Sequence, residues 1–239
     1  RGFESRSLRH FLNTYLFSRF DSLQKNEACM NWGDNFVLLE TLRRDKDNKQ
    51  NLLFTNPVDI IECRHQNKVQ LCFRIMEKYL QEGFYLAGFF SYELGYYLEE
   101  AFGGNLPPSA YPLIWLGVYP KPQKRIDAAP PGGEERFYLS MPSLAVKPAA
   151  YTKTIGTIKN LIASGETYQI NYTSKYSFNF FGNVFDFYQS LKNNQQVSYS
   201  ALLNHRGDYI ISLSPELFFR IDRQRNITDR KSTRLNSSH

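Results

Sequence analysis

After Gly165 the hydrophobic pattern changes from a helical period to a period of two, and this change limits what the segment can fold into. Four apolar residues recur at helical spacing and predict a helix that ends at Ser164-Gly165: Tyr151, Ile155, Ile158 and Ile162. After the glycine the period becomes two, which predicts a strand from Tyr168 to Phe178. The other face of this strand carries uncharged hydrogen-bonding side chains, Gln169, Asn171 and Thr173, followed by Lys175. Such a face can line a polar cavity.

A second polar cluster, Ser212-Leu213-Ser214-Pro215-Glu216, follows a predicted hairpin of strands at 199–204 and 209–213. Pro215 has a fixed φ and no N–H, so it ends the second strand and holds Glu216 at a defined corner. With a further strand at 217–221, the Glu216 carboxylate is expected to be paired or desolvated, which suits proton transfer. A glutamate that caps or bridges backbone groups would produce the same pattern.

The first half of the chain alternates short apolar runs with helical patterns. We expect strands at 36–41, 52–54, 84–90 and 113–119 and a helix through Val69, Phe73, Met76 and Leu80 that ends at Gly83. A second helix, capped by Ser91-Tyr92-Glu93, is expected to reach Phe102. Residues 120–148 are rich in Pro, Gly and charge and form the best internal boundary, although a strand at 136–141 interrupts them. A later helix is expected at 184–191.

Both ends of the chain differ from the rest. Residues 1–6 can be back-translated to the T-arm of a tRNA gene, and residues 229–239 resemble a translated sequencing adapter. We therefore expect a truncated reading frame with a genuine start at Met30. Its parts are a non-native or disordered leader at 1–30, an N-terminal region at 31–142, the start of a second domain at 143–228 and an artefactual tail at 229–239. A pair of natural disordered tails is the alternative.

Composition places the chain among globular proteins. With 239 residues, 42% of them apolar, it can bury a sizeable core. No apolar run reaches the roughly 18 residues that a membrane helix needs, and no secretory signal is present, so the cytoplasm is the expected compartment. The cysteines, Cys29, Cys63 and Cys72, lack paired or metal-ligand spacing and are expected to be free buried thiols.

The formal net charge of +6 lies in the end segments, because residues 1–30 carry +2 and residues 223–239 carry +4. The body between them is neutral overall. A site for a polyanion needs Lys and Arg gathered on a folded surface, so nucleic-acid binding is not expected.

Two segments carry a resemblance to a known family: Gly165-Glu166-Thr167-Tyr168-Gln169-Ile170-Asn171 and Ser212-Leu213-Ser214-Pro215-Glu216-Leu217-Phe218. In this order and at this separation they resemble the chorismate-binding enzymes, which include anthranilate, aminodeoxychorismate, isochorismate and salicylate synthases. The resemblance runs from about Phe36 to Thr228. It implies an α+β fold like that of anthranilate synthase component I, with two packed antiparallel β-sheets, surrounding helices and a C-terminal part that is missing here.

Three N-terminal segments, 38–41, 88–93 and 112–119, are similar to the aminodeoxychorismate synthase component I branch, which serves folate and para-aminobenzoate biosynthesis. Isochorismate and salicylate synthases carry a water-activating lysine where this chain has Gln169, an amide that cannot accept a proton at neutral pH. The resemblance therefore implies amination of chorismate with ammonia from a glutamine amidotransferase partner. A purely structural side chain is the alternative for Gln169.

The resemblance also assigns roles to the two polar clusters. Glu216 matches a glutamate that is implied to shuttle protons as the 4-hydroxyl of chorismate leaves. The candidates for the substrate pocket are Gln169, Asn171, Thr173 and Ser214.

Compared with that branch, the chain lacks the next motif. In aminodeoxychorismate synthases an Arg-Pro-x-Lys-Gly-Thr segment supplies a nucleophilic lysine, which by count from Glu216 falls at Ser232. The glutamates that hold Mg²⁺ in the family lie further on, so no metal ligands are expected in the sequence given. We therefore expect a catalytically inert polypeptide from a gene that encodes an enzyme.

In the family, a Leu-Leu-Glu-Ser segment and an Asn-Pro-Ser-Pro-Tyr-like loop form a tryptophan pocket. Leu38, Leu39, Glu40 and Thr41 fit the first segment, whereas residues 195–199, which end in Tyr199, depart from the second. These are the regulatory-pocket candidates, although plain strand core is the simpler explanation for Leu38 and Leu39.

Two alternative functions stay open. One is anthranilate synthase component I of tryptophan biosynthesis, which has a small apolar residue at the lysine position. The other is a non-catalytic module that binds an amidotransferase or a small aromatic ligand.

Overall fold

The computed structural model describes residues 15–18, 32–43, 51–99, 111–124, 137–221 and 227–228. Its largest unit is a six-stranded antiparallel sheet with the strand order β1-β13-β12-β2-β3-β7. These strands are β1 (Tyr15–Ser18), β2 (Asn35–Glu40), β3 (Leu52–Thr55), β7 (Gln123–Lys124), β12 (Tyr199–His205) and β13 (Asp208–Ser214). The sheet therefore joins strands from both sides of the 120–148 boundary.

A second antiparallel sheet has three strands in the order β4-β6-β5. They are β4 (Asp59–Cys63), β5 (Tyr85–Phe90) and β6 (Ile114–Tyr119). Helix α1 (Val69–Gln81), preceded by the 3₁₀ turn η1 (Gln66–Lys68), packs on the outer face of this sheet and buries Val69 and Cys72. The helix predicted from the apolar spacing is confirmed, and Gly83 follows its end with the positive φ of +87° that glycine adopts freely.

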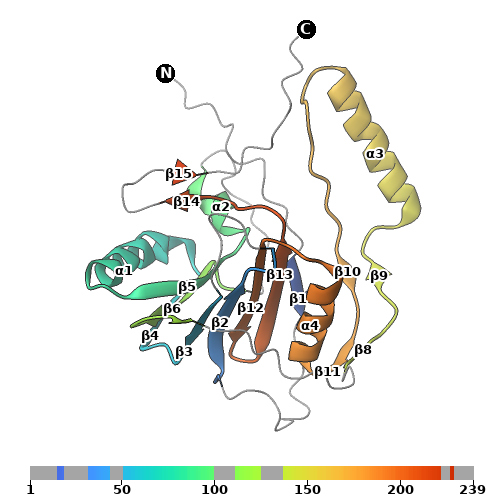
Figure 1. Cartoon of the computed structure of the whole chain (residues 1–239). Coiled ribbons are helices and arrows are strands. Elements are labelled where there is room, and N and C mark those ends of the chain that lie inside the picture. Colours follow the sequence, from blue (N-terminus) through green and yellow to red (C-terminus); the bar gives the residue numbers. More distant parts are fainter. Residues whose placement is uncertain are drawn as a thin grey trace, which may run out of the picture.

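The two sheets and two helices form four layers, from α1 through both sheets to α4 (Val184–Asn194) (Figure 1). On β6, Ile114, Leu116 and Val118 face α1, while Trp115 and Tyr119 face the larger sheet. The core between the sheets also contains residues of the larger sheet: Val37, Phe54, Leu203 and Ile210. The predicted α+β class with two packed antiparallel sheets is confirmed.

The far face of the larger sheet packs against α4 and the strand pair β8 (Phe137–Leu139) and β11 (Phe180–Gly182). Its buried residues include Leu38, Leu202 and Ile211 from the sheet and Phe187 and Tyr188 from α4. Asn183 starts α4 by accepting hydrogen bonds from the N–H groups of Phe185 and Asp186.

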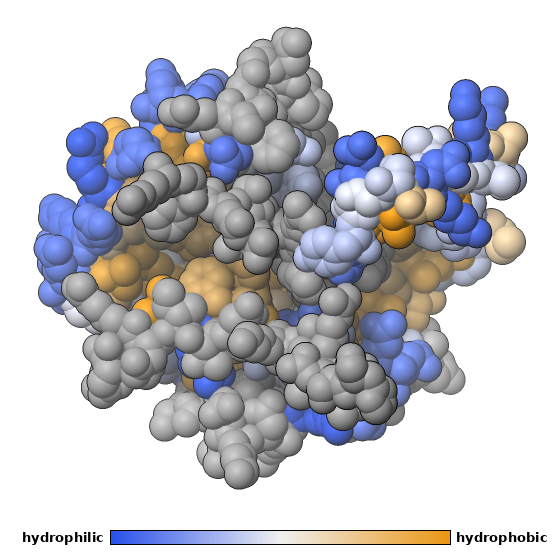
Figure 2. All heavy atoms as spheres, turned by 90° about the horizontal axis from the view of Figure 1, so that it is seen from above, coloured by the Kyte–Doolittle hydropathy of each residue, from blue (hydrophilic) through white to orange (hydrophobic). Residues whose placement is uncertain are grey.

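Between β9 (Ser143–Leu144) and β10 (Tyr176–Ser177), which pair with each other, the chain leaves the layers as an arm. Helix α3 (Pro148–Ala163) runs outward, and residues 165–175 return without regular structure. No residue of the arm is buried, and the exposed fraction is 45% for Tyr151 and 42% for Ile162. Figure 2 shows hydrophobic and hydrophilic residues side by side on the surface of this arm, at the right of the view.

The predicted strand from Tyr168 to Phe178 is therefore wrong except at Tyr176–Ser177. A strand needs a neighbour for its backbone groups, and an alternating sequence does not supply one. Two other predictions were too long: the helix expected to reach Phe102 is α2 (Leu94–Leu98), which lacks a side-chain cap, and the strand expected at 217–221 is β14 (Arg220–Ile221), paired with β15 (Ile227–Thr228).

The ends of the chain are described only in part. Of the expected leader at 1–30, four residues form β1, whereas Met30, Cys29 and the tail at 229–239 with Ser232 lie outside the described residues. Cys63 and Cys72 are free buried thiols, as expected. Within the described ranges, no helix has the length and apolar character needed to cross a membrane.

His205, the last residue of β12, is buried between the sheets against the rings of Trp115 and Phe89. Burial lowers the pKa of its imidazole below the ordinary value of 6.5, because the charged form loses its hydration. Glu62 and Asp208 act in the opposite direction, and Arg206 and Arg64 add to the lowering. The unfolded chain thus binds a proton that the folded chain does not, so stability falls as the pH drops below about 6.5.

We expect His205→Gln to flatten this acid side of the stability profile, because glutamine does not titrate. Denaturant unfolding between about pH 7 and pH 5 measures the slope. His65→Gln, at an exposed histidine, is the matched control and should keep the wild-type slope. Equal slopes in wild type and His205→Gln would contradict the assignment.

Candidate functional site

Several candidate residues lie at one end of the larger sheet, where β2 and β13 end and β12 begins. In the antiparallel registers, Glu40 lies opposite Ser200, and Tyr199 lies opposite Ser214. Glu216 follows two residues after the end of β13. We call this place the Glu40 end of the sheet.

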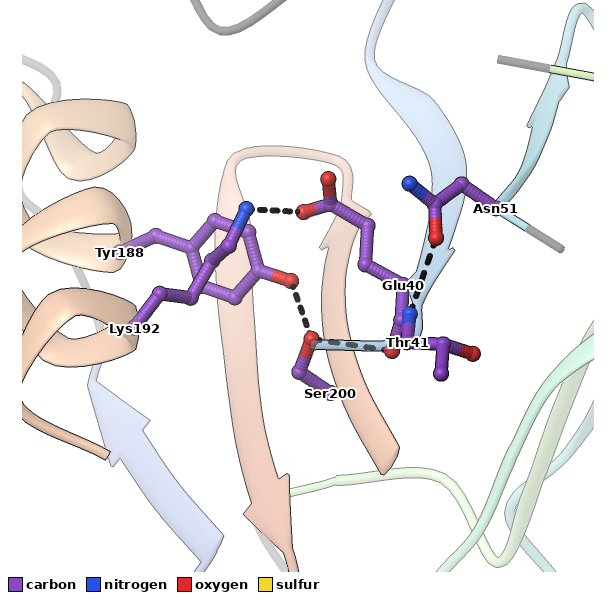
Figure 3. A network of polar contacts seen from close by, with 6 residues as sticks. All are labelled: Glu40, Thr41, Asn51, Tyr188, Lys192 and Ser200. Carbon is purple, nitrogen blue, oxygen red and sulfur yellow. Dashed lines mark hydrogen bonds and ion pairs between the residues drawn. The ribbon is translucent and has the colours of Figure 1, made fainter. Parts of the chain in front are cut away.

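Glu40 forms a buried ion pair with Lys192 of α4 (Figure 3). The Lys192 Nζ donates to Glu40 Oε2 at 2.8 Å, and the two side chains are only 11% and 8% exposed. The ammonium group also lies 5.0 Å from the centre of the Tyr188 ring. Because little water reaches either group, each charge depends on the other for its stabilisation.

Hydrogen bonds connect this pair to the strands (Figure 3). Ser200 Oγ donates to the backbone carbonyl of Glu40 at 3.1 Å, so the Tyr188 hydroxyl is the donor in its 3.0 Å contact with Ser200 Oγ. The Thr41 N–H donates to Asn51 Oδ1 at 2.9 Å. The network therefore joins α4 to β12, to β2 and to the residue before β3.

The regulatory-pocket candidates occupy different environments. Leu38 is completely buried in the core that faces α4, whereas Leu39 faces the other way and is 37% exposed. Thr41 is buried and Tyr199 is half-buried. Leu38 thus serves as strand core, and the carboxylate of Glu40 is occupied by Lys192.

Ser214 and Glu216 form a tight turn after β13. Ser214 Oγ accepts from the Glu216 N–H at 3.1 Å and donates to the Glu216 carbonyl oxygen at 2.8 Å. Ser214 is buried, but the side chains of Pro215 and Glu216 are exposed. The expected paired or desolvated carboxylate is not observed, since Glu216 forms no ion pair with any described residue and no strand follows it directly.

Gln169, Asn171 and Thr173 are exposed on the arm. Gln169 Nε2 donates to Asn171 Oδ1 over 3.5 Å, and the Thr167 hydroxyl donates to the Gln169 carbonyl oxygen at 3.1 Å. A ring contact of 5.7 Å between Tyr151 and Tyr172 holds the returning segment against α3. The two polar clusters therefore belong to different parts of the structure, one to the arm and one to the Glu40 end of the sheet.

The described residues do not fit a magnesium ion. Magnesium requires several oxygen ligands in a near-octahedral arrangement. No group of three or more His, Cys, Asp or Glu side chains comes together within the described ranges, and Lys192 already neutralises Glu40.

Sequence reasoning missed Lys192, Tyr188 and Ser200. Part of the signal was present, because Lys192 directly follows the helix predicted at 184–191 and lies four residues after Tyr188. An extension of that helix places both residues on one face. The contact of Lys192 with Glu40 had no local signal, since 152 residues separate the two.

A comparison with protein families gave a match that covers all the residues of the candidate site. The family model described as chorismate binding enzyme matches residues 35–230. This range contains both polar clusters and the Glu40 end of the sheet. A search of curated proteins gave no significant match.

We expect Lys192→Met to lower the free energy of unfolding by about 3–5 kcal/mol, because it leaves the Glu40 carboxylate buried without a partner. The double variant Glu40→Gln/Lys192→Met removes both charges and should lose much less. Unfolding by urea, which is uncharged and does not change the ionic strength, measures the free energy of unfolding of every variant. Lys78→Met, which breaks an exposed pair with Glu82, is the control and should have little effect. A loss from Lys192→Met no larger than this control would show that the buried pair does not anchor α4.

Proposed function

Because this chain belongs to the chorismate-binding enzyme family, whose members convert chorismate, we propose that it serves the amination of chorismate. The proposed reaction is that of aminodeoxychorismate synthase component I, in which chorismate and ammonia give 4-amino-4-deoxychorismate and water. A glutamine amidotransferase partner supplies the ammonia, and the product leads to para-aminobenzoate and folate in the cytoplasm.

The residue that favours amination over hydration is Gln169. A carboxamide has no basic lone pair at neutral pH, so it cannot activate water as a lysine at this position would. Its side chain makes a 3.5 Å contact with Asn171 and is exposed, which leaves it accessible to a ligand. Gln169, Asn171 and Thr173 are proposed to bind polar groups of the substrate.

Glu216 is the proposed proton donor for the leaving hydroxyl. The Ser214 turn holds its backbone through two hydrogen bonds and leaves the carboxyl group exposed. The C4–O bond breaks as the oxygen takes a proton and departs as water, and the resulting Glu216 carboxylate can accept a proton from the added amine.

The nucleophile and the metal ion of the proposed reaction are not assigned to residues of this chain. Ser232, a hydroxyl-bearing residue, stands where the aminodeoxychorismate synthases place a nucleophilic lysine. The described residues do not fit Mg²⁺, the cofactor that the family resemblance implies, so no step is assigned to it. We therefore expect no turnover of chorismate by this polypeptide alone.

The test begins with long-read sequencing of the source DNA across the codon for Thr228, followed by expression of the protein that the established frame encodes. A lysine at position 232 together with formation of 4-amino-4-deoxychorismate from chorismate and ammonium supports the proposal. A small apolar residue there with anthranilate as product identifies anthranilate synthase component I instead. Isochorismate as product would overturn the argument from Gln169. A frame that reads as given, with no product, would leave the non-catalytic binding module.

In the active protein, we expect Glu216→Gln to lower kcat by about 100-fold or more, the usual effect of removing a general acid. Folding should be unaffected because the side chain is exposed. Glu77→Gln on α1, another exposed carboxylate, is the matched control and should keep the wild-type kcat. An unchanged kcat in Glu216→Gln would rule out the proton-donor role.

A further inference from the structure

Four side chains between the two sheets carry buried polar atoms for which the described residues offer no hydrogen-bond partner. These atoms are Asn35 Oδ1, Trp115 Nε1, Tyr119 Oη and both ring nitrogens of His205. Trp115 and Tyr119 are completely buried, and His205 is 4% exposed. Native interiors seldom leave so many polar atoms unpaired in one place, because each has lost its hydration without a replacement.

The four side chains come from three strands and point into the same layer. Trp115 and Tyr119 alternate onto the inner face of β6 with Gly117 between them, and a Cβ at Gly117 would collide with the Tyr119 hydroxyl. This hydroxyl therefore lies over Gly117, between the two aromatic residues along the strand. The His205 ring is centred 5.2 Å from that of Trp115, and Asn35 is the register partner of His205 on β2.

The hydrogen-bonding chemistry of these groups is complementary to water. The indole N–H of Trp115 can only donate, the Asn35 oxygen can only accept, and the Tyr119 hydroxyl does both. A neutral imidazole has one donor and one acceptor nitrogen. Water can accept from Trp115 and Tyr119 while donating to Asn35 and His205, and a buried water typically makes about three such bonds.

At the rim of this layer, His205 Nε2 lies 3.8 Å from Glu62 Oε2, which is too long for a direct hydrogen bond. Glu62 is itself paired with Arg64 and with Arg206, which lies 3.5 Å away. Asp208 also acts on His205, so two carboxylates and two guanidinium groups balance each other at this rim. A neutral ligand therefore fits this place better than an ion.

We propose that ordered water is an integral part of the core between the two sheets, bound by Trp115, Tyr119, His205 and Asn35. The ligand class is a small neutral molecule that both donates and accepts hydrogen bonds, and water is the one that is always present. This site lies at the His205 end of β12, opposite to the Glu40 end, and is separate from the residues proposed to bind chorismate.

The test combines a high-resolution crystal structure of the whole chain with oxygen-17 relaxation dispersion of the solvent, which detects long-lived buried water and ignores exchanging hydroxyl protons. We expect density for water within about 3.2 Å of Trp115 Nε1 and of at least one of the other three groups. In solution, the double variant Asn35→Leu/Tyr119→Phe should lose the dispersion contribution of at least one long-lived water. Tyr188→Phe, in the other core, is the matched control and should keep it.

Two results would overturn the proposal. One is a crystal structure in which these groups bond directly to one another with no water between them. The other is an unchanged dispersion amplitude in a folded Asn35→Leu/Tyr119→Phe protein. If the double variant does not fold, the single variant Tyr119→Phe and the crystal structure of the wild type decide the question.

Discussion

The packing of β6 between two layers is the constraint on which the other elements depend. Every residue of this strand is buried, because one face meets α1 and the other meets the larger sheet. Full burial of a large apolar side chain contributes on the order of 1.5–3 kcal/mol, so one six-residue strand supplies much of the attraction that holds three layers together. With one face of the larger sheet covered in this way, its other face can receive α4.

The Glu40 end and the His205 end of β12 handle buried polar groups differently. At the Glu40 end, the protein satisfies them itself, since Lys192, Tyr188 and Ser200 form a closed set of contacts with the end of β2. At the His205 end, a Glu62 carboxylate oxygen is 3.8 Å from the imidazole, and further buried polar atoms have no hydrogen-bond partner among the described residues. The first arrangement anchors a helix, whereas the second suits a small bound molecule.

The proposed substrate residues are divided between a rigid part and an exposed part. Ser214 and Glu216 follow a central strand and are held by defined hydrogen bonds, as preorganised sites require. Gln169 and Asn171 lie on an arm that contributes no buried residue. A ligand that contacts both clusters would tie the arm to the sheets, and the cost of ordering the arm would reduce its affinity.

The sequence by itself determined the elements whose stabilising bonds are local. Apolar spacing predicted α1, the alternation around a turn at Arg206-Gly207 predicted the β12–β13 hairpin, and two polar clusters indicated the family that residues 35–230 match. A helix closes its hydrogen bonds within itself, and a hairpin pairs with its neighbour in the chain. Such elements can be read from a short window of residues.

Only the tertiary structure decided the partners of distant groups. The residues at 168–178 do alternate in hydrophobicity, but only Tyr176–Ser177 pairs with another strand. Strand pairing depends on which other strand lies beside the segment. Likewise, nothing near Glu40 in the sequence indicates Lys192, and nothing near Glu216 indicates that its side chain stays exposed. Periodicity is a property of the chain, whereas burial and pairing arise when segments far apart in sequence are packed together.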